Sequence, residues 1–298
     1  MMKQSRNEGD DIAGVVEKVG ANVTEFKPGD RVAAFHEMLT PHGSYAEYAI
    51  AWAHTTFHIP KNTSFEEAAA IPLAAMTAAI GLFHPSRLAL PQPWSVPTDA
   101  GPTPLVIYGA ASAVGSYAVQ LASRSNIHPL ICIAGRGAAH VESFIDRSKG
   151  DTIIDYRGGA AAVVEGIKAA IPPNTPLLHA YDAVSDHGSY VNIGQCLAEG
   201  GQITLVLPFK EYEGMPAHVT QTITNVGAVH QDAKEFGFVW FRVLGRGLGE
   251  GWLRAQPQEI VPGGLGGVQK ALENLRDGRA SAVKYVFRVA ETEGVARG

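Results

Sequence analysis

Short apolar runs alternate with helix-patterned stretches through the middle of the chain. The runs have the character of buried strands and lie at 105–108, 129–134, 152–156, 177–184 and 202–207. Between them, apolar residues recur at helical spacing at 116–123, 138–147, 160–171 and 190–197. Regular alternation of strands and helices is typical of a doubly wound parallel sheet with helices on both faces. The pattern therefore predicts an α/β fold for this central part.

The part before this sheet has a different pattern. Strand-like stretches at 11–20, 31–33 and 45–50 are separated by turns rich in Gly and Pro, which predicts a small β-rich region. Ser64 and Glu67 have the spacing of a capping box, which opens a helix at this point.

Proline shapes the segment that joins the two regions. Pro72 is expected to end the capped helix at Ala70, and a second helix is expected over 74–83. Six prolines between 84 and 104 exclude a regular helix or a central strand there and predict an irregular arm. After the central sheet, an amphipathic helix at 266–276 and a last strand at 284–289 are predicted.

Composition removes several classes of function. The chain has 298 residues, 46% of them hydrophobic and 18% charged, with a net charge of −5 and no basic block, so nothing favours nucleic acid or an anionic membrane. The N-terminus lacks the apolar core of a secretory signal, and no apolar run is long enough to span a bilayer. We therefore expect a cytoplasmic protein.

The metal-ligating residue types are sparse. Cys132 and Cys196 both lie in apolar, strand-like surroundings, which predicts buried free thiols and excludes a four-cysteine zinc site. Four histidines of the N-terminal part have no cysteine partner at zinc spacing: His36, His42, His54 and His58. The sequence therefore predicts no metal site.

The strongest candidate for ligand binding is the turn between the first buried strand and the helix that follows it. Its residues 109–115 read Gly-Ala-Ala-Ser-Ala-Val-Gly, and only Gly115 matches a glycine of the dinucleotide fingerprint G-x-G-x-x-G. A helix N-terminus at such a turn offers N–H donors and a positive dipole end to a diphosphate. The turn predicts cofactor contacts from Ala111, Ser112, Ala113 and Val114. The alternative is a strand–helix unit that binds nothing.

The end of the second strand bears on which nucleotide would bind. Ala134, Gly135, Arg136 and Gly137 include no acidic residue for the ribose hydroxyls of NAD, whereas Arg136 can pair with a 2′-phosphate. We therefore predict NADPH, with an ordinary exposed loop arginine as the alternative. Tyr156, after the third strand, is predicted to contact the adenosine part, and the alternative is a strand-end aromatic without a ligand.

Several segments in order resemble the medium-chain dehydrogenase/reductase family. They are Asp11-x-x-Gly14, the turn Lys27-Pro28-Gly29-Asp30-Arg31-Val32, the stretch Gly43-Ser44-Tyr45-Ala46-Glu47-Tyr48, the helix from Glu66 to Ala78 and the turn 109–115. Within that family the chain is most similar to the enoyl reductases that serve fungal polyketide synthases in trans. The element Leu90-Pro91-Gln92-Pro93-Trp94, the pair Leu207-Pro208 and the run Asp155-Tyr156-Arg157 carry this closer likeness.

The resemblance implies a fold, a domain plan and a set of contacts. The fold is a doubly wound Rossmann sheet with an incomplete GroES-like β-rich catalytic domain. The domains are a partial catalytic domain at 1–72, an NADP-binding domain at 73–225 and a segment at 226–298 that returns to the catalytic domain. It adds Leu207 and Pro208 to the cofactor residues. Substrate contacts are expected from Met76, Thr77, Asn225, Val226, Gly227, Ala228 and Val229.

The resemblance also implies a reaction, which is zinc-free hydride transfer from NADPH to an activated C=C bond of an acyl chain. The acyl chain would be carried on a polyketide synthase. We assign the proton donor to no residue. Family members have a further segment before the Asp11 strand, so the resemblance implies a chain shortened at its N-terminus. Two alternatives stay open: a zinc-free quinone-type reductase, and a catalytically inert protein that binds NADP or a partner.

Overall fold

The computed structural model describes residues 8–96 and 101–294, and these form two compact units. Unit 1 takes residues 1–76 and 226–298 of the chain, and unit 2 takes residues 77–225. The chain passes from the first unit to the second inside one helix, α2 (Pro72–Phe83), and returns between Asn225 and Val226.

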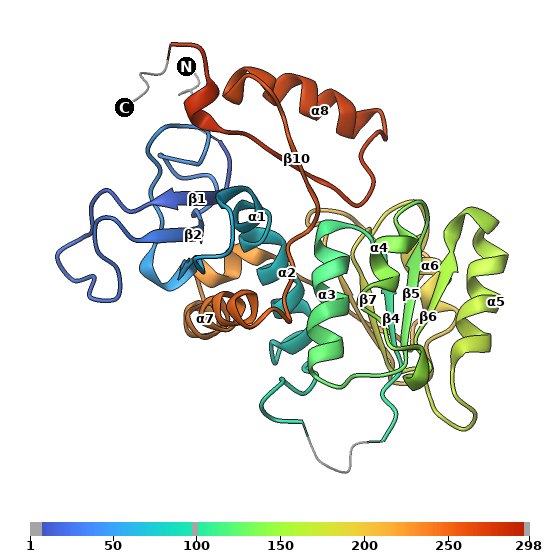
Figure 1. Ribbon diagram of the computed structural model, residues 1–298. Helices are drawn as coiled ribbons and strands as arrows, with labels where there is room; N and C mark the ends of the chain where they lie inside the picture. Colours follow the sequence, from blue (N-terminus) through green and yellow to red (C-terminus); the bar gives the residue numbers. More distant parts are fainter. Residues whose placement is uncertain (1–7, 97–100, 295–298) are drawn as a thin grey trace. The chain divides into compact units, whose positions relative to one another are not determined.

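Unit 2 is built on a six-stranded sheet in which every pair of neighbours is parallel (Figure 1). The order β6-β5-β4-β7-β8-β9 places β4 in the middle, with the chain winding outward to either side. This is the doubly wound arrangement predicted from the sequence. The strands are β4 (Leu105–Tyr108), β5 (Leu130–Ala134), β6 (Thr152–Asp155), β7 (His179–Asp182), β8 (Gln202–Leu205) and β9 (Thr220–Ile223).

Helices cover this sheet and bury its apolar runs. The helix α3 (Ala113–Arg124) packs along β4 and β5, α5 (Ala160–Ala170) along β5 and β6, and α6 (Ser189–Gly194) along β7. Because both faces are covered, the central strands β4 and β5 read as nearly continuous apolar runs instead of alternating ones. Their side chains form a fully buried core that includes Val106, Ile131, Ile133, Ile203 and Leu205.

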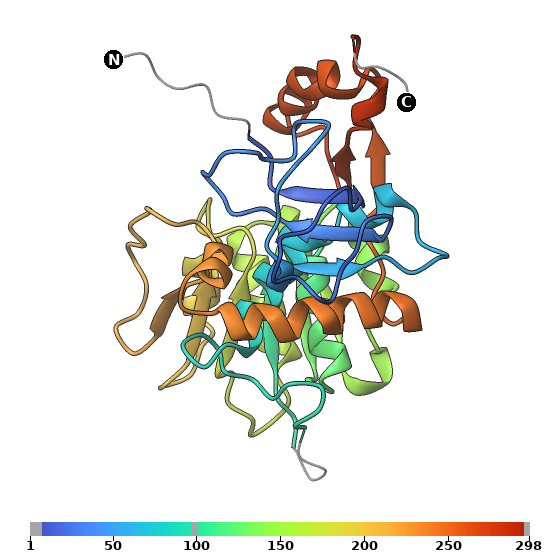
Figure 2. The ribbon, with the colours of Figure 1, turned by 90° about the vertical axis from the view of Figure 1, so that its left-hand side faces the viewer.

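Unit 1 contains the β-rich region. Its antiparallel sheet has the order β1-β2-β3, from β1 (Asp11–Val15), β2 (Arg31–Phe35) and β3 (Thr56–His58). A long helix, α7 (Lys234–Glu250), packs on β3, as the view in Figure 2 shows. The other elements are α1 (Phe65–Ala69), α8 (Val268–Arg276) and a parallel pair of strands, β10 (Gln258–Ile260) and β11 (Lys284–Val286).

The capping box at the start of α1 is confirmed. The Ser64 hydroxyl oxygen accepts from the backbone N–H of Glu67 at 3.1 Å, and the Glu67 carboxylate accepts from the N–H of Ser64 at 2.8 Å. The expected start of the next helix was two residues late, since Pro72 is the first residue of α2. Proline suits that position because it has no N–H to leave unpaired there and its φ is already helical.

The prediction of a strand at 45–50 is wrong. The stretch is a series of bends, held at its ends by Tyr45 N–H donating to the carbonyl of Glu8 and Ile50 N–H donating to the carbonyl of His42. Within the described chain no strand lies beside it, so its alternating side chains have no ladder to join. Alternation of apolar and polar side chains is a property of one segment, whereas a hydrogen-bonded ladder needs two segments side by side.

Three other expectations need correction. The helix expected over 138–147 ends at Glu142 in α4 (Ala138–Glu142), because Asp151 accepts the N–H of Asp146 and Asp146 caps a separate 3₁₀ turn. The strand expected to reach 289 stops at Val286. Cys132 is buried in β5, whereas Cys196 is half-buried and follows α6.

A histidine lies buried in unit 1 where its charge is disfavoured. His230 ends a 3₁₀ turn, Val226–His230, and is 8% exposed between the rings of Phe35 and His54, whose centroids lie 5.1 Å and 5.6 Å from its own. Burial lowers the pKa of His230 from 6.5 to about 4. The unfolded chain therefore takes up a proton at this side chain at a higher pH than the folded chain does.

We expect the free energy of unfolding to fall as the pH drops from about 6.5 towards 4, by on the order of 3 kcal/mol from His230. The variant His230→Leu removes this group, so its unfolding free energy should change less over the same range. Urea unfolding at a series of pH values measures the slope. His187→Asn is the control, because the His187 side chain is 89% exposed and its loss should leave the slope unchanged. Equal slopes for wild type and His230→Leu would contradict the prediction.

Candidate functional site

The residues predicted to contact the cofactor all lie at one edge of the sheet in unit 2. In a parallel sheet the carboxyl ends of the strands meet at the same edge, which is where doubly wound folds bind ligands. The residues 111–114 follow β4, 134–137 end and follow β5, Tyr156 follows β6, and Leu207 and Pro208 follow β8. The topology therefore brings together four segments that are far apart in the sequence.

The turn after β4 is shaped by two glycines. Gly109 has a φ of +71°, which L-residues rarely adopt, and its carbonyl accepts from the N–H of Ser112 at 2.8 Å. A Cβ on Gly115 would lie 2.2 Å from that same carbonyl oxygen, so no side chain fits there. The close approach of these two glycines fixes the tight entry into α3.

Ser112 caps the helix that leaves this turn. Its hydroxyl oxygen accepts from the N–H of Gly115 at 3.0 Å, so α3 begins at Ala113, three residues earlier than the periodicity indicated. Ser116 N–H makes the first bond back along the helix, to the carbonyl of Ser112. The N–H groups of Ala113 and Val114 remain as the donors that a helix start directs outward. A 12-residue helix adds the positive end of its dipole at this point.

A second contact surface lies where β5 and β6 end. The ring of Tyr156 passes so close to Gly135 that a Cβ there would be 2.6 Å from a ring carbon. Tyr156 is 46% exposed, and the neighbouring Arg136 is exposed as well. Gly137 stands before the first residue of α4. The strand ends thus hold an aromatic ring and a guanidinium group in adjacent positions, both accessible to a ligand.

One residue that shapes this edge was missed in the sequence. Asp182, at the end of β7, is fully buried, and its carboxylate accepts from Val184 N–H at 3.0 Å, Ser185 N–H at 2.8 Å and the Ser189 hydroxyl at 2.5 Å. Burial raises its pKa, and these donors act against that rise. The loop it holds contacts Gly109 through Val184. The spacing of Ser185 and Ser189, three and seven residues after Asp182, was the sequence signal that could have indicated this role.

The loop after β8 is tied to the loop after β7. Val206 N–H donates to the Ser185 hydroxyl at 2.8 Å, and the Lys210 ammonium donates to the Ser185 carbonyl at 3.0 Å and to Asp186 at 2.5 Å. The Tyr212 hydroxyl donates to the carbonyl of Leu207 at 2.7 Å. Leu207 and Pro208 are exposed on this braced loop.

The residues predicted to contact substrate are divided between the units. Met76 and Thr77 are consecutive buried residues of α2, but Met76 belongs to unit 1 and Thr77 to unit 2. The carbonyl of Thr77 accepts from the buried Tyr181 hydroxyl of β7 at 2.9 Å. Asn225 ends unit 2, and Val226, Gly227, Ala228 and Val229 form the 3₁₀ turn that begins the second part of unit 1. The structure therefore leaves their joint role as a prediction.

The N-terminal histidines make ordinary contacts. The carbonyl of Ile50 lies 2.6 Å from His36 Nδ1, that of Val229 lies 2.9 Å from His54 Nε2, and that of Glu25 lies 3.3 Å from His58 Nε2. Across residues 8–96 and 101–294, no three His, Cys, Asp or Glu side chains are grouped so as to hold a metal ion.

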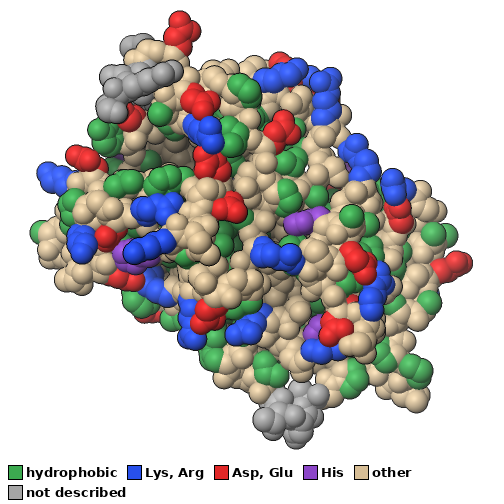
Figure 3. Space-filling model, viewed as in Figure 1, with side chains coloured by type: hydrophobic (Ala, Val, Ile, Leu, Met, Phe, Trp, Pro, Cys, Tyr) green, Lys and Arg blue, Asp and Glu red, His purple; other side chains and the backbone are tan. Residues whose placement is uncertain are grey.

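The surface charge is mixed in sign. On the face in Figure 3, Lys and Arg side chains lie interspersed with Asp and Glu. Of the helices that the structure describes, none has the length and apolar character needed to cross a bilayer.

The chain has close relatives of known name. Residues 2–61 match the alcohol dehydrogenase GroES-like domain. The chain is 53% identical over 262 residues to the trans-enoyl reductase fsr4 of Gibberella fujikuroi, covering 88% of this chain and 77% of that protein. It is also 27% identical to lovC of Aspergillus terreus, the enoyl reductase component of lovastatin nonaketide synthase, over 94% of this chain and 81% of that protein.

Solved structures share the fold. A putative zinc-dependent alcohol dehydrogenase from Rhizobium etli superposes with a TM-score of 0.75 at 23% identity, covering 93% of this chain and 79% of that one. The CurK enoyl reductase gives a TM-score of 0.67 at 18% identity, covering 93% and 78%. The architecture of both units is therefore that of known two-domain reductases and dehydrogenases.

The turn geometry makes a direct prediction about stability. Gly115→Ala should lower the free energy of unfolding by roughly 2–4 kcal/mol, because the added methyl group meets the Gly109 carbonyl and the turn must move. Gly249→Ala in α7 is the matched control, since the nearest atom to its Cβ is 3.5 Å away and alanine favours a helix. Urea unfolding of both variants measures the difference. A Gly115→Ala variant as stable as Gly249→Ala would show that the turn is not constrained as described.

Proposed function

Because this chain belongs to the medium-chain dehydrogenase/reductase family, we propose that it is a trans-acting enoyl reductase that uses NADPH to reduce the activated C=C bond of an acyl chain carried on a polyketide synthase. The 53% identity to trans-enoyl reductase fsr4 over 88% of the chain is the main support for assigning this chain to the enoyl reductase reaction. The name of lovC, a component of a nonaketide synthase, supports a polyketide synthase as the partner.

The edge of the unit 2 sheet fits a dinucleotide. The close approach of Gly109 and Gly115 fixes the start of α3, and a helix start is where a diphosphate can approach free backbone N–H groups. There the N–H groups of Ala113 and Val114 would donate to its oxygens. The Ser112 oxygen is already used as an acceptor in the cap, so its hydroxyl proton is the part left for a phosphate.

The neighbouring strand ends suit the adenosine half. The exposed ring of Tyr156, held against Gly135, presents a face on which an adenine can stack. Arg136, the residue after Gly135, offers a planar fork of donors to a 2′-phosphate, and the stretch 134–137 at the end of β5 contains no carboxylate. These two features support NADPH over NADH.

The chemistry of such a site divides between cofactor and protein. Bound NADPH supplies the hydride, and the protein supplies binding and orientation. In unit 2, Asp182 fixes the loop that contacts the nucleotide turn, and Lys210 braces the loop carrying Leu207 and Pro208. We expect these loops to hold the nicotinamide half in place. Met76, Thr77 and the stretch 225–229 remain our proposal for the substrate side.

Turnover tests the proposed reaction. Purified protein should oxidise NADPH in the presence of an α,β-unsaturated acyl thioester and deliver a saturated product, with deuterium at the β-carbon when deuterated NADPH is used. The matched variant is Ala113→Glu. Its carboxylate favours the helix start but occupies the position proposed for the diphosphate, so the variant should fold and lose turnover. Turnover with a simple quinone and none with the thioester would overturn the proposal, as would NADPH binding without any reduction.

The cofactor preference has its own test. We expect NADPH to bind at least tenfold more tightly than NADH, because a charge-assisted pair with Arg136 contributes about 1.5–3 kcal/mol. Arg136→Asp should remove this gap by weakening NADPH binding while leaving NADH binding nearly unchanged. Lys168→Asp, on the exposed side of α5, changes the net charge equally and should keep the gap. Fluorescence titration of the three proteins with each nucleotide gives six dissociation constants, and equal wild-type affinities would refute the preference.

A further inference from the structure

A hydrogen bond within unit 1 joins two turns that are far apart in the sequence. His54 lies in a 3₁₀ turn, Ala53–Thr55, directly before β3, and its Nε2 atom is 2.9 Å from the carbonyl oxygen of Val229 in the turn Val226–His230. A carbonyl oxygen can only accept, so the Nε2–H group of His54 is the donor. Both turns belong to unit 1. The bond therefore holds the turn 226–230 to the N-terminal part of the same unit.

The turn that receives this bond has an inner and an outer side. The side chains of Val226 and Val229 are buried, whereas Gly227 and Ala228 are half-buried. Val229 is seated against α7, where a Cβ on Gly237 would come within 2.9 Å of the Val229 Cβ. The glycine thus lets the turn lie close to the helix. The position of the outer residues 227 and 228 depends on how Val229 is held.

The last two carbonyls before His230 are paired in different ways. The carbonyl of Ala228 accepts from the N–H groups of Gln231 and Ala233, both at 2.9 Å, so it is paired within its own segment. The carbonyl of Val229 accepts from the His54 side chain instead. The turn is therefore tied to a distant segment at Val229, and removing the imidazole gives the turn freedom to move.

Arg242 of α7 holds the backbone of His54. Its guanidinium group donates to the carbonyl of Ala53 at 3.2 Å and to the carbonyl of His54 at 3.3 Å. The same group pairs with the Glu25 carboxylate, 3.1 Å from Nε, and its Cζ atom lies 3.8 Å from the ring centre of Phe238. Charge-assisted hydrogen bonds are stronger than neutral ones. Arg242 therefore fixes the direction in which the imidazole leaves its turn.

The surroundings also keep the imidazole uncharged. Burial lowers the pKa of His54 from its usual 6.5, and the cationic side chains of Lys234 and Arg242 add to this effect, although the bond to Val229 opposes it. A neutral imidazole carries one proton, and the bond to Val229 places that proton on Nε2. His54 thus donates from one fixed tautomer at neutral pH.

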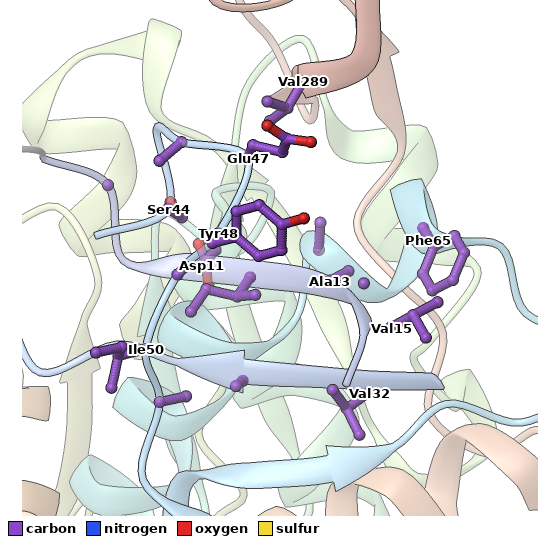
Figure 4. A pocket seen from close by; sticks show the side chains of 18 of the residues that line it. Asp11, Ala13, Val15, Val32, Ser44, Glu47, Tyr48, Ile50, Phe65 and Val289 are labelled. Atoms are coloured by element: carbon purple, nitrogen blue, oxygen red, sulfur yellow. The ribbon is translucent and has the colours of Figure 1, made fainter. Parts of the chain in front are cut away.

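These contacts are separate from the groove in unit 1 that Figure 4 shows. That groove has a volume of about 1150 Å³ and is lined by β1, the stretch 44–51, α1 and the stretch 284–290. Among the described residues, its lining includes Ala53 but neither His54 nor Val229. Changes at His54 therefore report on the turn 226–230 and not on this groove.

We propose that His54 is a positioning residue for the acyl substrate, which sets the place of Gly227 and Ala228 through the Val229 carbonyl, and that Arg242 acts through His54. The inference rests on the proposed function, in which the stretch 225–229 lies on the substrate side. His54, Val229 and Arg242 all belong to unit 1, whereas the cofactor edge belongs to unit 2, so their loss should affect the acyl chain and not the nucleotide. Small displacements of groups that position a substrate are costly, even far from the chemistry.

Matched variants at His54 test the inference. His54→Leu removes the donor, whereas His54→Gln keeps an amide N–H at a similar reach. In the presence of NADP⁺, binding of a saturated acyl thioester should weaken at least tenfold in His54→Leu and return to within threefold of wild type in His54→Gln. The dissociation constants for NADPH, measured by fluorescence titration, should stay within twofold of wild type in both variants.

His218→Leu is the control for the loss of such a bond elsewhere. His218 Nε2 lies 3.2 Å from the carbonyl of Leu197, and both residues belong to unit 2. The variant therefore loses the same kind of bond as His54→Leu, but its thioester binding should match wild type. A tenfold loss in His218→Leu as well would show a general effect of destabilisation and overturn the inference.

Amide hydrogen exchange reports on the turn itself. Gln231 and Ala233 donate to the Ala228 carbonyl, so their N–H groups should exchange at least fivefold faster in His54→Leu than in wild type or His54→Gln. Equal exchange in His54→Leu and wild type would overturn the inference, and so would equal thioester binding by these two proteins. Wild-type protein that binds the thioester more tightly than His54→Leu but does not reduce it would support the inference and refute the proposed reaction. Wild-type protein that does not bind the thioester would overturn both.

A double-mutant cycle tests the role of Arg242. Arg242→Lys keeps the charge but loses the planar fork that reaches two carbonyls and Glu25, so it should weaken thioester binding about threefold. If Arg242 acts through His54, adding Arg242→Lys to His54→Leu should cause no further loss. Losses that simply add would give Arg242 a separate role and overturn this part of the proposal.

Discussion

The contact between Gly109 and Gly115 is the constraint on which the candidate site depends. The backbone of β4 and the first turn of α3 approach so closely that the Gly109 carbonyl occupies the place where a Cβ of residue 115 would be. This approach aims the helix start across the edge of the sheet, and the Ser112 cap then uses one N–H and leaves two directed outward. The position that we propose for a diphosphate follows from this one contact.

The two units differ in how far the backbone groups of their strands are paired in ladders. In the six-stranded sheet of unit 2, every strand pairs with a parallel neighbour on both sides, except at the outer edges of β6 and β9. Helices cover the faces of this sheet. Among the described residues of unit 1, no strand pairs with the edge of β1 that faces away from β2 or with the stretch 45–50, although both have the sequence of strands. An unpaired strand edge and exposed apolar side chains thus lie together in unit 1.

Much of the fold was predictable where local pattern and final environment agree. The buried runs that became β4 and β5 are apolar on both faces, and the Ser64 capping box needs only residues three apart, so neighbouring sequence was enough. The segments 111–114, 134–137, 156 and 207–208 lie at one edge of the sheet because parallel topology requires it. Failures came where a distant partner decides: the bends at 45–50, the early end of α4 at the Asp151 carboxylate, and the exposure of Cys196.

By itself, the sequence determined the doubly wound class, the place of the small-residue turn after β4 and the family likeness, since these depend on periodicity, on small residues at a turn and on ordered motifs. Only the tertiary structure decided three further points. It showed that Gly115 is required by a carbonyl rather than by a ligand, that the buried Asp182 holds the loop against Gly109, and that β1 has a free edge beside an unpaired stretch. The physical reason is the same in each case: a close approach, a satisfied carboxylate and a missing ladder are relations between segments distant in the chain, and no single segment contains them.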